Sequence, residues 1–176
     1  MTDVTIYIAQ SLDGYIADAE GSIAWLRPFE AGDYGYDAFY GRIDAVVMGT
    51  GTYRDCRRFP DWPYRGKAVM VMTKSGRLDD DGLAVFDDRT AVEIAVDLER
   101  AGLGRIWVAG GSGPIRAFLD AGLVRRLRIF TIPLLLGSGT PLWKPGKRRW
   151  NATLERSVTH GNGVVETVHA LAAAQS

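Results

Sequence analysis

The stretch RIWVAGGSGPIRAFLDAGLV, residues 105–124, constrains the fold more than any other part of the sequence. Its first apolar residues lead into the glycine-rich run Gly110–Gly113, and a helical spacing of apolar residues follows. Pro114 suits the start of a helix, where its missing N–H has no partner to lose. The inward face of this helix is expected to comprise Ile115, Phe118 and Leu119. This order predicts a buried strand, a tight turn and a helix that covers a parallel sheet.

Segments with the same alternation occupy the rest of the chain. Further strands are expected at residues 4–9, 45–48, 68–72, 83–86 and 127–136, and helices at residues 34–42 and 90–100. The last two strand segments, residues 153–160 and 163–169, are joined across Gly161-Asn162, which suits a tight hairpin. The sequence therefore predicts an α/β fold in a single domain over residues 1–176. Its sheet is expected to be mixed and mostly parallel, flanked by helices, with a C-terminal antiparallel hairpin.

Composition excludes several classes of protein. The 176 residues are 47% hydrophobic, so the chain is able to bury a sizeable core. Its 21 basic and 21 acidic side chains balance, which argues against a nucleic-acid partner. One cysteine rules out an internal disulfide. Without a basic and then apolar leader, or an apolar run of about 18 residues, we expect a soluble, cytoplasmic protein with no membrane partner.

Glycines at the junction of a strand and a helix have two interpretations. They permit a tight turn, or they let a phosphate approach the backbone N–H groups at the positive end of the helix dipole. The familiar nucleotide loops do not match. Arg116 stands where a Rossmann pattern read from Gly111 requires Gly or Ala, and no Gly-Lys pair is followed by Ser or Thr.

Two further strand ends favour the phosphate interpretation. Met48 leads into Gly49-Thr50-Gly51-Thr52, and Met72 leads into Thr73-Lys74-Ser75. In an open parallel sheet, ligands bind beyond the carboxyl ends of the strands. Three such ends with small, hydroxyl or cationic residues therefore predict a site for an anionic nucleotide.

Four motifs, in order along the chain, resemble the dihydrofolate reductase-like superfamily. They are AQSLDGYIA at residues 9–17, VMG followed by TY at residues 47–53, GGS at residues 110–112 and PLLLGSG at residues 133–139. The resemblance is greatest to the reductase of riboflavin biosynthesis, the C-terminal domain of the bacterial deaminase-reductase (RibD), and to its stand-alone relatives. It extends from residue 4 to about residue 143.

The resemblance implies a homodimer whose central sheet binds NADPH along its carboxyl edge. The turn at Gly110–Gly113 would hold the pyrophosphate, and Ala9 with the loop from Ser11 to Ile16 would border the nicotinamide. The strand end at residues 73–75 would meet the adenosine ribose and its 2′-phosphate. The implied cofactor-binding residues are Ala9, Ser11, Ile16, Gly49, Thr50, Thr52, Tyr53, Thr73, Lys74, Ser75, Gly110, Gly111, Ser112, Gly113 and Ile115.

Two features depart from the family. An arginine that can pair with the 2′-phosphate often follows the family's Met-Gly pair, and this chain has Thr50 there. NADH is therefore an alternative to NADPH. The deaminase motif, His-x-Glu with Pro-Cys-x-x-Cys, is absent from the sequence. The resemblance thus implies a reductase alone and leaves its substrate open.

Hydride transfer to a C=N or C=O bond also needs a proton donor. Asp33 is the first candidate, because dihydrofolate reductases keep a substrate-binding carboxylate ahead of the first helix; its alternative role is a helix N-cap. Asp13, in the loop beside the expected nicotinamide, is the second candidate, and Asp37 lies one turn beyond Asp33. His160 and His169 lack metal-ligand spacing, so no metal site is expected.

We therefore expect an NADPH-dependent reductase that transfers hydride to a small substrate. That substrate is a heterocycle or a ribosylamino-pyrimidine or pteridine-like compound, as for a 5-amino-6-(5-phosphoribosylamino)uracil reductase. The alternative is a nucleotide-binding regulatory or interaction module of the same fold without turnover. A third interpretation, nucleic-acid binding through the basic cluster at residues 144–149, is disfavoured by the balanced charge.

Overall fold

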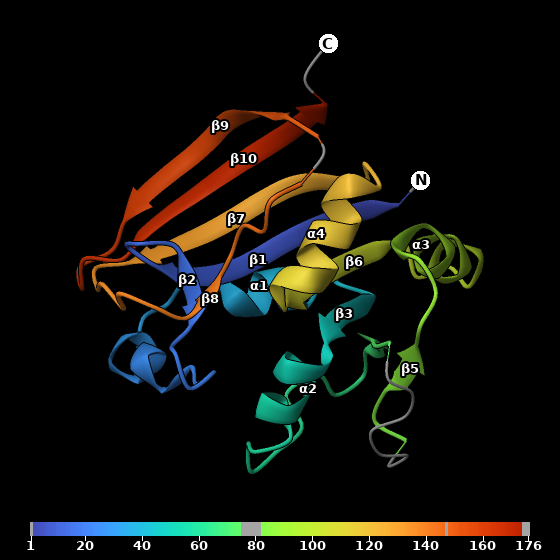
Figure 1. Ribbon diagram of the computed structural model, residues 1–176, viewed down its shortest axis with the longest axis horizontal. Helices are drawn as coiled ribbons and strands as arrows, with labels where there is room; N and C mark the ends of the chain where they lie inside the picture. The colour runs from blue at the N-terminus through green and yellow to red at the C-terminus, as the bar shows by residue number, and fades with distance from the viewer. Residues whose placement is uncertain (1, 75–81, 147, 174–176) are drawn as a thin grey trace.

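Strands and helices alternate along most of the chain, as the sequence predicts (Figure 1). The computed structural model describes residues 2–74, 82–146 and 148–173. The strands are β1 (Asp3–Ser11), β2 (Tyr15–Ala17), β3 (Ala45–Gly49), β4 (Ala68–Met72), β5 (Val85–Asp87), β6 (Arg105–Gly110), β7 (Val124–Ile132), β8 (Thr140–Pro141), β9 (Trp150–Thr159) and β10 (Val165–Ala173). The helices are the 3-10 helix η1 (Ala24–Phe29), α1 (Tyr36–Tyr40), α2 (Thr50–Cys56), α3 (Ala91–Arg100) and α4 (Ser112–Asp120).

Eight strands form one sheet in the order β5-β4-β3-β6-β1-β7-β10-β9. The strands from β5 to β7 in this order are parallel to their neighbours, whereas β10 runs antiparallel to both β7 and β9. β2 and β8 form a separate antiparallel pair. The predicted mixed, mostly parallel sheet with a C-terminal antiparallel hairpin is confirmed. Figure 1 shows that hairpin, in red, at the outer edge of the sheet.

Helices cover both faces of the parallel strands, because side chains on both faces are apolar. α3 and α4 pack on one face, against Ile6, Val47 and Val108, and Phe118 of α4 is fully buried there. α1 and α2 contribute to a second cluster on the other face, which includes Trp107 of β6. With both faces covered, the ends of the strands are where a ligand can reach the sheet.

The first helix is shorter than expected. A helix was predicted over residues 34–42, but α1 begins at Tyr36, and its N-cap is Gly35 with a φ of 65°. The N-cap role considered for Asp33 is therefore wrong. Its Oδ1 instead accepts a hydrogen bond of 2.9 Å from the Gly35 N–H, which forms a turn ahead of the helix.

The strand expected to reach Leu136 ends earlier, at Ile132. Pro133 follows and has no N–H to donate to a neighbouring strand, which explains the end of the pairing. The chain then turns back, because the Leu134 N–H donates to the Ile132 carbonyl at 2.7 Å. The residues beyond this point form a loop on which β8 lies.

The closing hairpin has a three-residue loop rather than the two-residue loop expected. Gly161 and Asn162 are the central residues of its turn, since the Gly163 N–H donates to the His160 carbonyl at 2.9 Å. Gly163 has a φ of 84°, and the His160 N–H donates to the Val164 carbonyl at 2.8 Å. A turn followed by a left-handed glycine is a common way to close an antiparallel pair.

Candidate functional site

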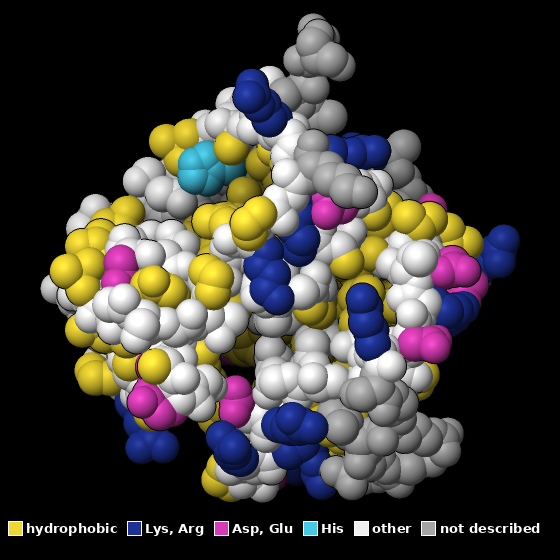
Figure 2. Space-filling model, viewed as in Figure 1, with side chains coloured by type: hydrophobic (Ala, Val, Ile, Leu, Met, Phe, Trp, Pro, Cys, Tyr) yellow, Lys and Arg dark blue, Asp and Glu magenta, His cyan; other side chains and the backbone are white. Residues whose placement is uncertain are grey.

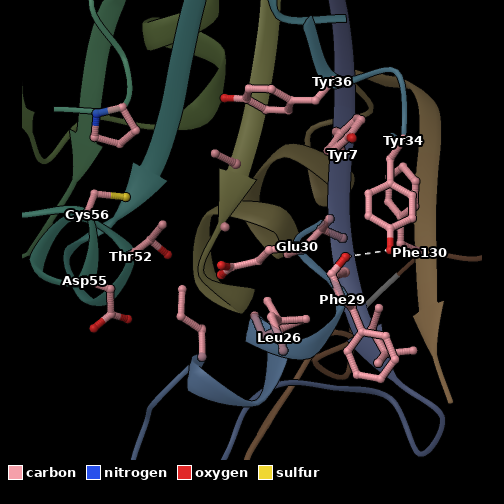
Figure 3. A pocket seen from close by; sticks show the side chains of 18 of the residues that line it. Tyr7, Leu26, Phe29, Glu30, Tyr34, Tyr36, Thr52, Asp55, Cys56 and Phe130 are labelled. Carbon is pink, nitrogen blue, oxygen red and sulfur yellow. Dashed lines mark hydrogen bonds between the residues drawn. The ribbon is translucent and has the colours of Figure 1, made fainter. Parts of the chain in front are cut away.

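A cavity of about 520 Å³ lies at the carboxyl ends of β1, β6 and β7. Its other walls are α2, η1 and the segment that leads from η1 into α1. Figure 2 shows the hollow near the centre of this face, and Figure 3 shows how side chains from these elements project into it. The position matches the place where open parallel sheets bind ligands.

Two strand-to-helix turns meet beside the cavity. A Cβ on Gly110, at the end of β6, would lie 2.9 Å from Oγ1 of Thr52 on α2. A Cβ on Gly111 would lie 3.3 Å from Cδ of Pro114 and 3.4 Å from the backbone of Gly49, and Gly111 has a φ of 80°. The close contact between the turns and the backbone conformation therefore require these two glycines even without a ligand.

At two other positions, Gly51 and Gly113, neither a close contact nor the backbone conformation requires a glycine. Each lies in the first turn of its helix, α2 or α4, and a Cβ on either would have no heavy atom within 4 Å. A glycine inside a helix costs about 1 kcal/mol relative to alanine. Open space beside two helix N-termini is what an anion requires if it approaches the backbone closely.

The wall opposite these turns is η1 and the chain that follows it, an element that the sequence analysis did not predict. Tyr34 fastens this wall, because its hydroxyl donates to the Phe29 carbonyl at 2.7 Å (dashed in Figure 3) and accepts from Nδ2 of Asn162 at 2.6 Å. Arg128 donates from a terminal nitrogen to the Tyr34 carbonyl at 2.5 Å. β7 and the β9–β10 turn thus hold the segment that places Glu30 in the cavity.

Arg128 and Glu166 form a buried ion pair behind this wall. Nε of Arg128 lies 2.8 Å from Oε1 of Glu166, and Glu166 is 1% exposed. The guanidinium also lies 4.9 Å from the ring centroid of Tyr7 and 5.4 Å from that of Phe130. Arg156 also lies near Glu166, with a terminal nitrogen 3.9 Å from Oε2. The charge of Arg128 is thus neutralised behind the cavity, which Arg128 does not line.

The charged side chains that line the cavity are carboxylates. Within the described residues they are Glu30 and Asp55, and no Lys, Arg or His lines it. Burial raises the pKa of the Asp55 carboxyl, an effect that nearby Arg58 offsets in part. In Figure 3 the carboxyl group of Glu30 points across the cavity toward α2, which carries Thr52 and Asp55.

Aromatic side chains form most of the remaining surface. Burial raises the pKa of Tyr7 to about 12 and that of Tyr36 to about 12, so both hydroxyls remain neutral hydrogen-bonding groups at neutral pH. Burial also raises the pKa of the Cys56 thiol, which lines the cavity one turn after Thr52. The aromatic residues that line the cavity are Tyr7, Phe29, Tyr34, Tyr36, Phe59, Tyr64, Trp107 and Phe130.

The structure brings several of the expected cofactor residues together. Those that line the cavity are Ala9, Ile16, Thr52, Gly110 and Gly111. Gly49 lies behind Gly111, and Thr50 and Gly113 lie at the starts of α2 and α4. Lys74 is exposed just beyond β4. Ser75, which was also predicted to meet the adenosine ribose and its 2′-phosphate, lies outside the described residues.

Five of the expected residues have buried side chains instead, and none of these lines the cavity. Tyr53 packs against the rings of Trp62 and Phe86, and Ile115 belongs to the core beneath α4. The helical turn directs both side chains to the core, so only the backbone of these two residues is left to meet a cofactor, and that contact stays a prediction. The buried hydroxyl residues are Ser11, Thr73 and Ser112.

Neither expected proton donor lines the cavity. Asp33 is exposed and accepts the hydrogen bond from Gly35 described above. The Asp13 carboxylate accepts from the Ser11 hydroxyl at 2.6 Å and from the Gly137 N–H at 2.7 Å, and the Ser11 bond contributes most to lowering its pKa. Asp13 thus ties the turn after β1 to the loop after β7, and the carboxyls in the cavity are Glu30 and Asp55.

A sequence signal existed for one of these two carboxyls. Asp55 lies three residues after Thr52, which the sequence analysis singled out, and in α2 this spacing puts the two side chains on one face. Glu30 had no such signal. It follows a 3-10 helix that contains Pro28, and this segment shows neither helical nor strand periodicity.

The part of the chain that the structure describes holds neither a cluster of metal ligands nor a membrane-spanning helix. No group of three or more His, Cys, Asp or Glu side chains is placed to hold a metal ion there. Nε2 of His160 lies 3.3 Å from Oε2 of Glu166, beside the ion pair with Arg128. No helix in residues 2–74, 82–146 or 148–173 is long and apolar enough to cross a membrane.

Comparison with known proteins agrees with this architecture. A family model described as "RibD C-terminal domain" matches residues 2–166. The "Uncharacterized protein YwjB" of Bacillus subtilis (strain 168) is 38% identical over 140 residues, covering 78% of this chain and 80% of that protein. The "Riboflavin biosynthesis protein RibD" of Corynebacterium ammoniagenes is 31% identical over 150 residues, covering 77% of this chain and 44% of that protein. A solved structure from Shewanella sp. PV-4, with a provisional riboflavin-biosynthesis name, has a TM-score of 0.88 and 29% identity, covering 97% of this chain and 99% of that one.

Asp55→Asn tests the burial of a carboxyl in the cavity wall. Because the folded protein raises the pKa of Asp55, the stability it contributes is present at acid pH and is lost as the pH rises through the folded pKa. The variant stays neutral, so its free energy of unfolding relative to wild type should increase between about pH 3 and pH 7. Urea denaturation over this range measures the difference, with the exposed Asp61→Asn as control. A difference that falls with rising pH would contradict the assignment.

Proposed function

Because the chain belongs to the RibD C-terminal domain family, we propose that it is an NADPH-dependent reductase. It transfers hydride to a small heterocyclic substrate or to a ribosylamino-pyrimidine or pteridine-like one. The observation that carries the proposal is an apolar cavity between two glycine-containing helix N-termini and an aromatic wall. A reduced dinucleotide needs the helix N-termini for its pyrophosphate and the aromatic wall beside its nicotinamide.

The residues present fit a dinucleotide. Gly51 and Gly113 leave the backbone open at the starts of α2 and α4, which would hold the pyrophosphate. Ala9 and Ile16 line the cavity and would border the nicotinamide. Lys74, exposed after β4, would meet the 2′-phosphate. NADPH, when bound, supplies the hydride.

The chain's own residues orient the substrate, exclude water and supply a proton. The aromatic wall, fixed by the hydrogen bonds of Tyr34, gives an apolar surface that keeps water from the reacting carbon. A carboxyl that faces the cavity supplies the proton, and Glu30 and Asp55 are the described carboxyls that do so. Burial raises the pKa of Asp55, which favours the protonated form that a donor needs.

NADPH binding by calorimetry and NADPH oxidation with a panel of pteridines and ribosylaminopyrimidines test the proposal together. Binding with substrate-dependent oxidation supports a reductase. Binding without oxidation of NADPH by any member of the panel would favour the alternative, a nucleotide-binding module that keeps the fold without turnover. Absence of binding would contradict both.

Gly113→Ala tests the phosphate site without disturbing the fold. A Cβ at this position meets no atom of the protein, and alanine is the better helix former, so the free protein should gain roughly 0.4–1 kcal/mol of stability. The methyl group would occupy space that the pyrophosphate needs, so the Kd for NADPH should rise at least about tenfold, or about 1.4 kcal/mol. Thermal unfolding and calorimetry measure the two effects.

The control for this variant is Gly161→Ala in the β9–β10 turn, another glycine with open space around its Cβ position and no positive φ. It should leave NADPH binding unchanged. Substitution of Gly111 is less informative, because its φ of 80° strains any side chain whether or not a ligand binds. A folded Gly113→Ala protein with wild-type NADPH affinity would refute the site.

Lys74→Ala tests the choice between NADPH and NADH. Thr50 offers no charge to a 2′-phosphate, and Lys74 is the described cation at the end of β4. A charge-assisted contact contributes roughly 1.5–3 kcal/mol, and a flexible ammonium is expected in the lower half of that range, about tenfold to thirtyfold. The variant should weaken NADPH by that factor and leave NADH almost unchanged, with Lys144→Ala as control. Equal wild-type affinity for the two cofactors would show that Lys74 does not discriminate.

A further inference from the structure

We propose that one end of the cavity takes a flat, uncharged or cationic heterocycle and excludes a phosphate group. This aromatic end is formed by Tyr7, Phe29, Tyr34, Tyr36 and Phe130. The proposal rests on the proposed function in one respect, namely that the occupant of the aromatic end is the substrate. It narrows that substrate to compounds without a phosphate on the part that enters the cavity.

The charge of the lining is the first reason. Within the described residues, Glu30 and Asp55 line the cavity and no Lys, Arg or His does. The Glu30 carboxyl points into the open space between the aromatic end and α2 (Figure 3). A phosphate dianion that entered the aromatic end would lose water, make no direct contact with a cationic side chain and meet like charges, and each of these costs free energy. A neutral or cationic ring avoids all three costs.

The fixed geometry of the rings is the second reason. Tyr7 stacks on Phe39 with ring centroids 4.4 Å apart, and its ring lies 4.8 Å from that of Phe130. Tyr34 meets Phe130 edge to face at 5.5 Å, and hydrogen bonds to Phe29 and Asn162 hold its hydroxyl. These contacts leave the rings little freedom, so they present a rigid apolar surface on which a flat heterocycle packs well.

Arg128 and Arg58 lie close to the cavity, and each is paired with a carboxylate. Arg128 binds Glu166 and the Tyr34 carbonyl, and it is not among the lining residues. Arg58 lies 3.0 Å from Asp55, with 77% of its side chain exposed, so it faces water at the rim. Arg128 lies behind the rings of Tyr7 and Phe130, where Glu166 neutralises it, so neither arginine offers a direct contact to a phosphate at the aromatic end.

Riboflavin and riboflavin 5′-phosphate are suitable probes, because both are flat and fluorescent and they differ by one phosphate. Each is titrated into the protein at low ionic strength by fluorescence, with excess NADP⁺ present to compete for the glycine turns. We expect riboflavin to bind at least about tenfold more tightly than its phosphate. Rising salt should reduce this ratio, because it screens the repulsion.

Glu30→Gln tests whether the cavity lining causes the preference for riboflavin over its phosphate. Glu30 is exposed to the cavity rather than to the core, so the variant should fold, which a thermal melt checks. Removing one of the two lining charges should lower the binding ratio by at least about threefold. Glu20→Gln is the matched control, because Glu20 is exposed and does not line the cavity. It should leave the ratio unchanged.

Equal binding of the two probes, no binding of either, or an unchanged ratio in Glu30→Gln would overturn the proposal. Tighter binding of the phosphate would also overturn it, and loss of that advantage in Arg58→Gln would identify Arg58 as a phosphate ligand. The proposed function fails by a separate result, namely that NADPH neither binds nor reduces a substrate. The probe ratio needs no turnover, so the two failures are distinguishable.

Discussion

Contact between two strand-to-helix turns is the constraint on which the site depends. The turn from β6 into α4 lies so close to the turn from β3 into α2 that a Cβ on Gly110 would be 2.9 Å from Oγ1 of Thr52, and one on Gly111 would be 3.4 Å from the Gly49 backbone. The β3–β6 pairing also shifts register here, so that Met48 pairs with Gly110 and Ala109 is an extra residue. Such a bulge redirects the strand at the edge of a site. The two helix N-termini therefore face the same space at the carboxyl edge of the sheet.

The second wall has a different origin, because it depends on contacts between segments far apart in the sequence. η1 carries Glu30 into the cavity, but β7 and the closing hairpin hold it there through Arg128 and Asn162. The buried charge of Glu166 keeps Arg128 in place. The antiparallel hairpin thus completes the sheet and also fixes the aromatic surface on which a substrate would pack. In the proposed reaction, a rigid cavity of this kind would favour hydride transfer, because little ordering remains to be done on binding.

Local patterns predicted the parts of the fold and site that local physics determines. Strand alternation and the glycine turns predicted the sheet and placed Thr52 and Gly111 at its carboxyl edge, and the family resemblance placed Ala9 there; all three line the cavity. For Tyr53 the sequence did not predict which way the side chain points: the turn of α2 directs it to the core. Glu30 was not predicted, because a 3-10 helix gives no periodic signal and its position depends on the long-range contacts of Tyr34. The family resemblance favoured a carboxyl three residues further on, at Asp33, which is exposed and does not line the cavity.

The central claim, that a dinucleotide occupies the cavity beside α2, is tested most directly through Cys56. This residue is the single cysteine of the sequence, and it lines the cavity one turn beyond Thr52. The rate at which a thiol reagent modifies Cys56 is measured over a range of NADPH concentrations, with peptide mapping to confirm the site. The account predicts that NADPH slows modification, with half-maximal protection at the Kd found by calorimetry. An unchanged rate at saturating NADPH would contradict it.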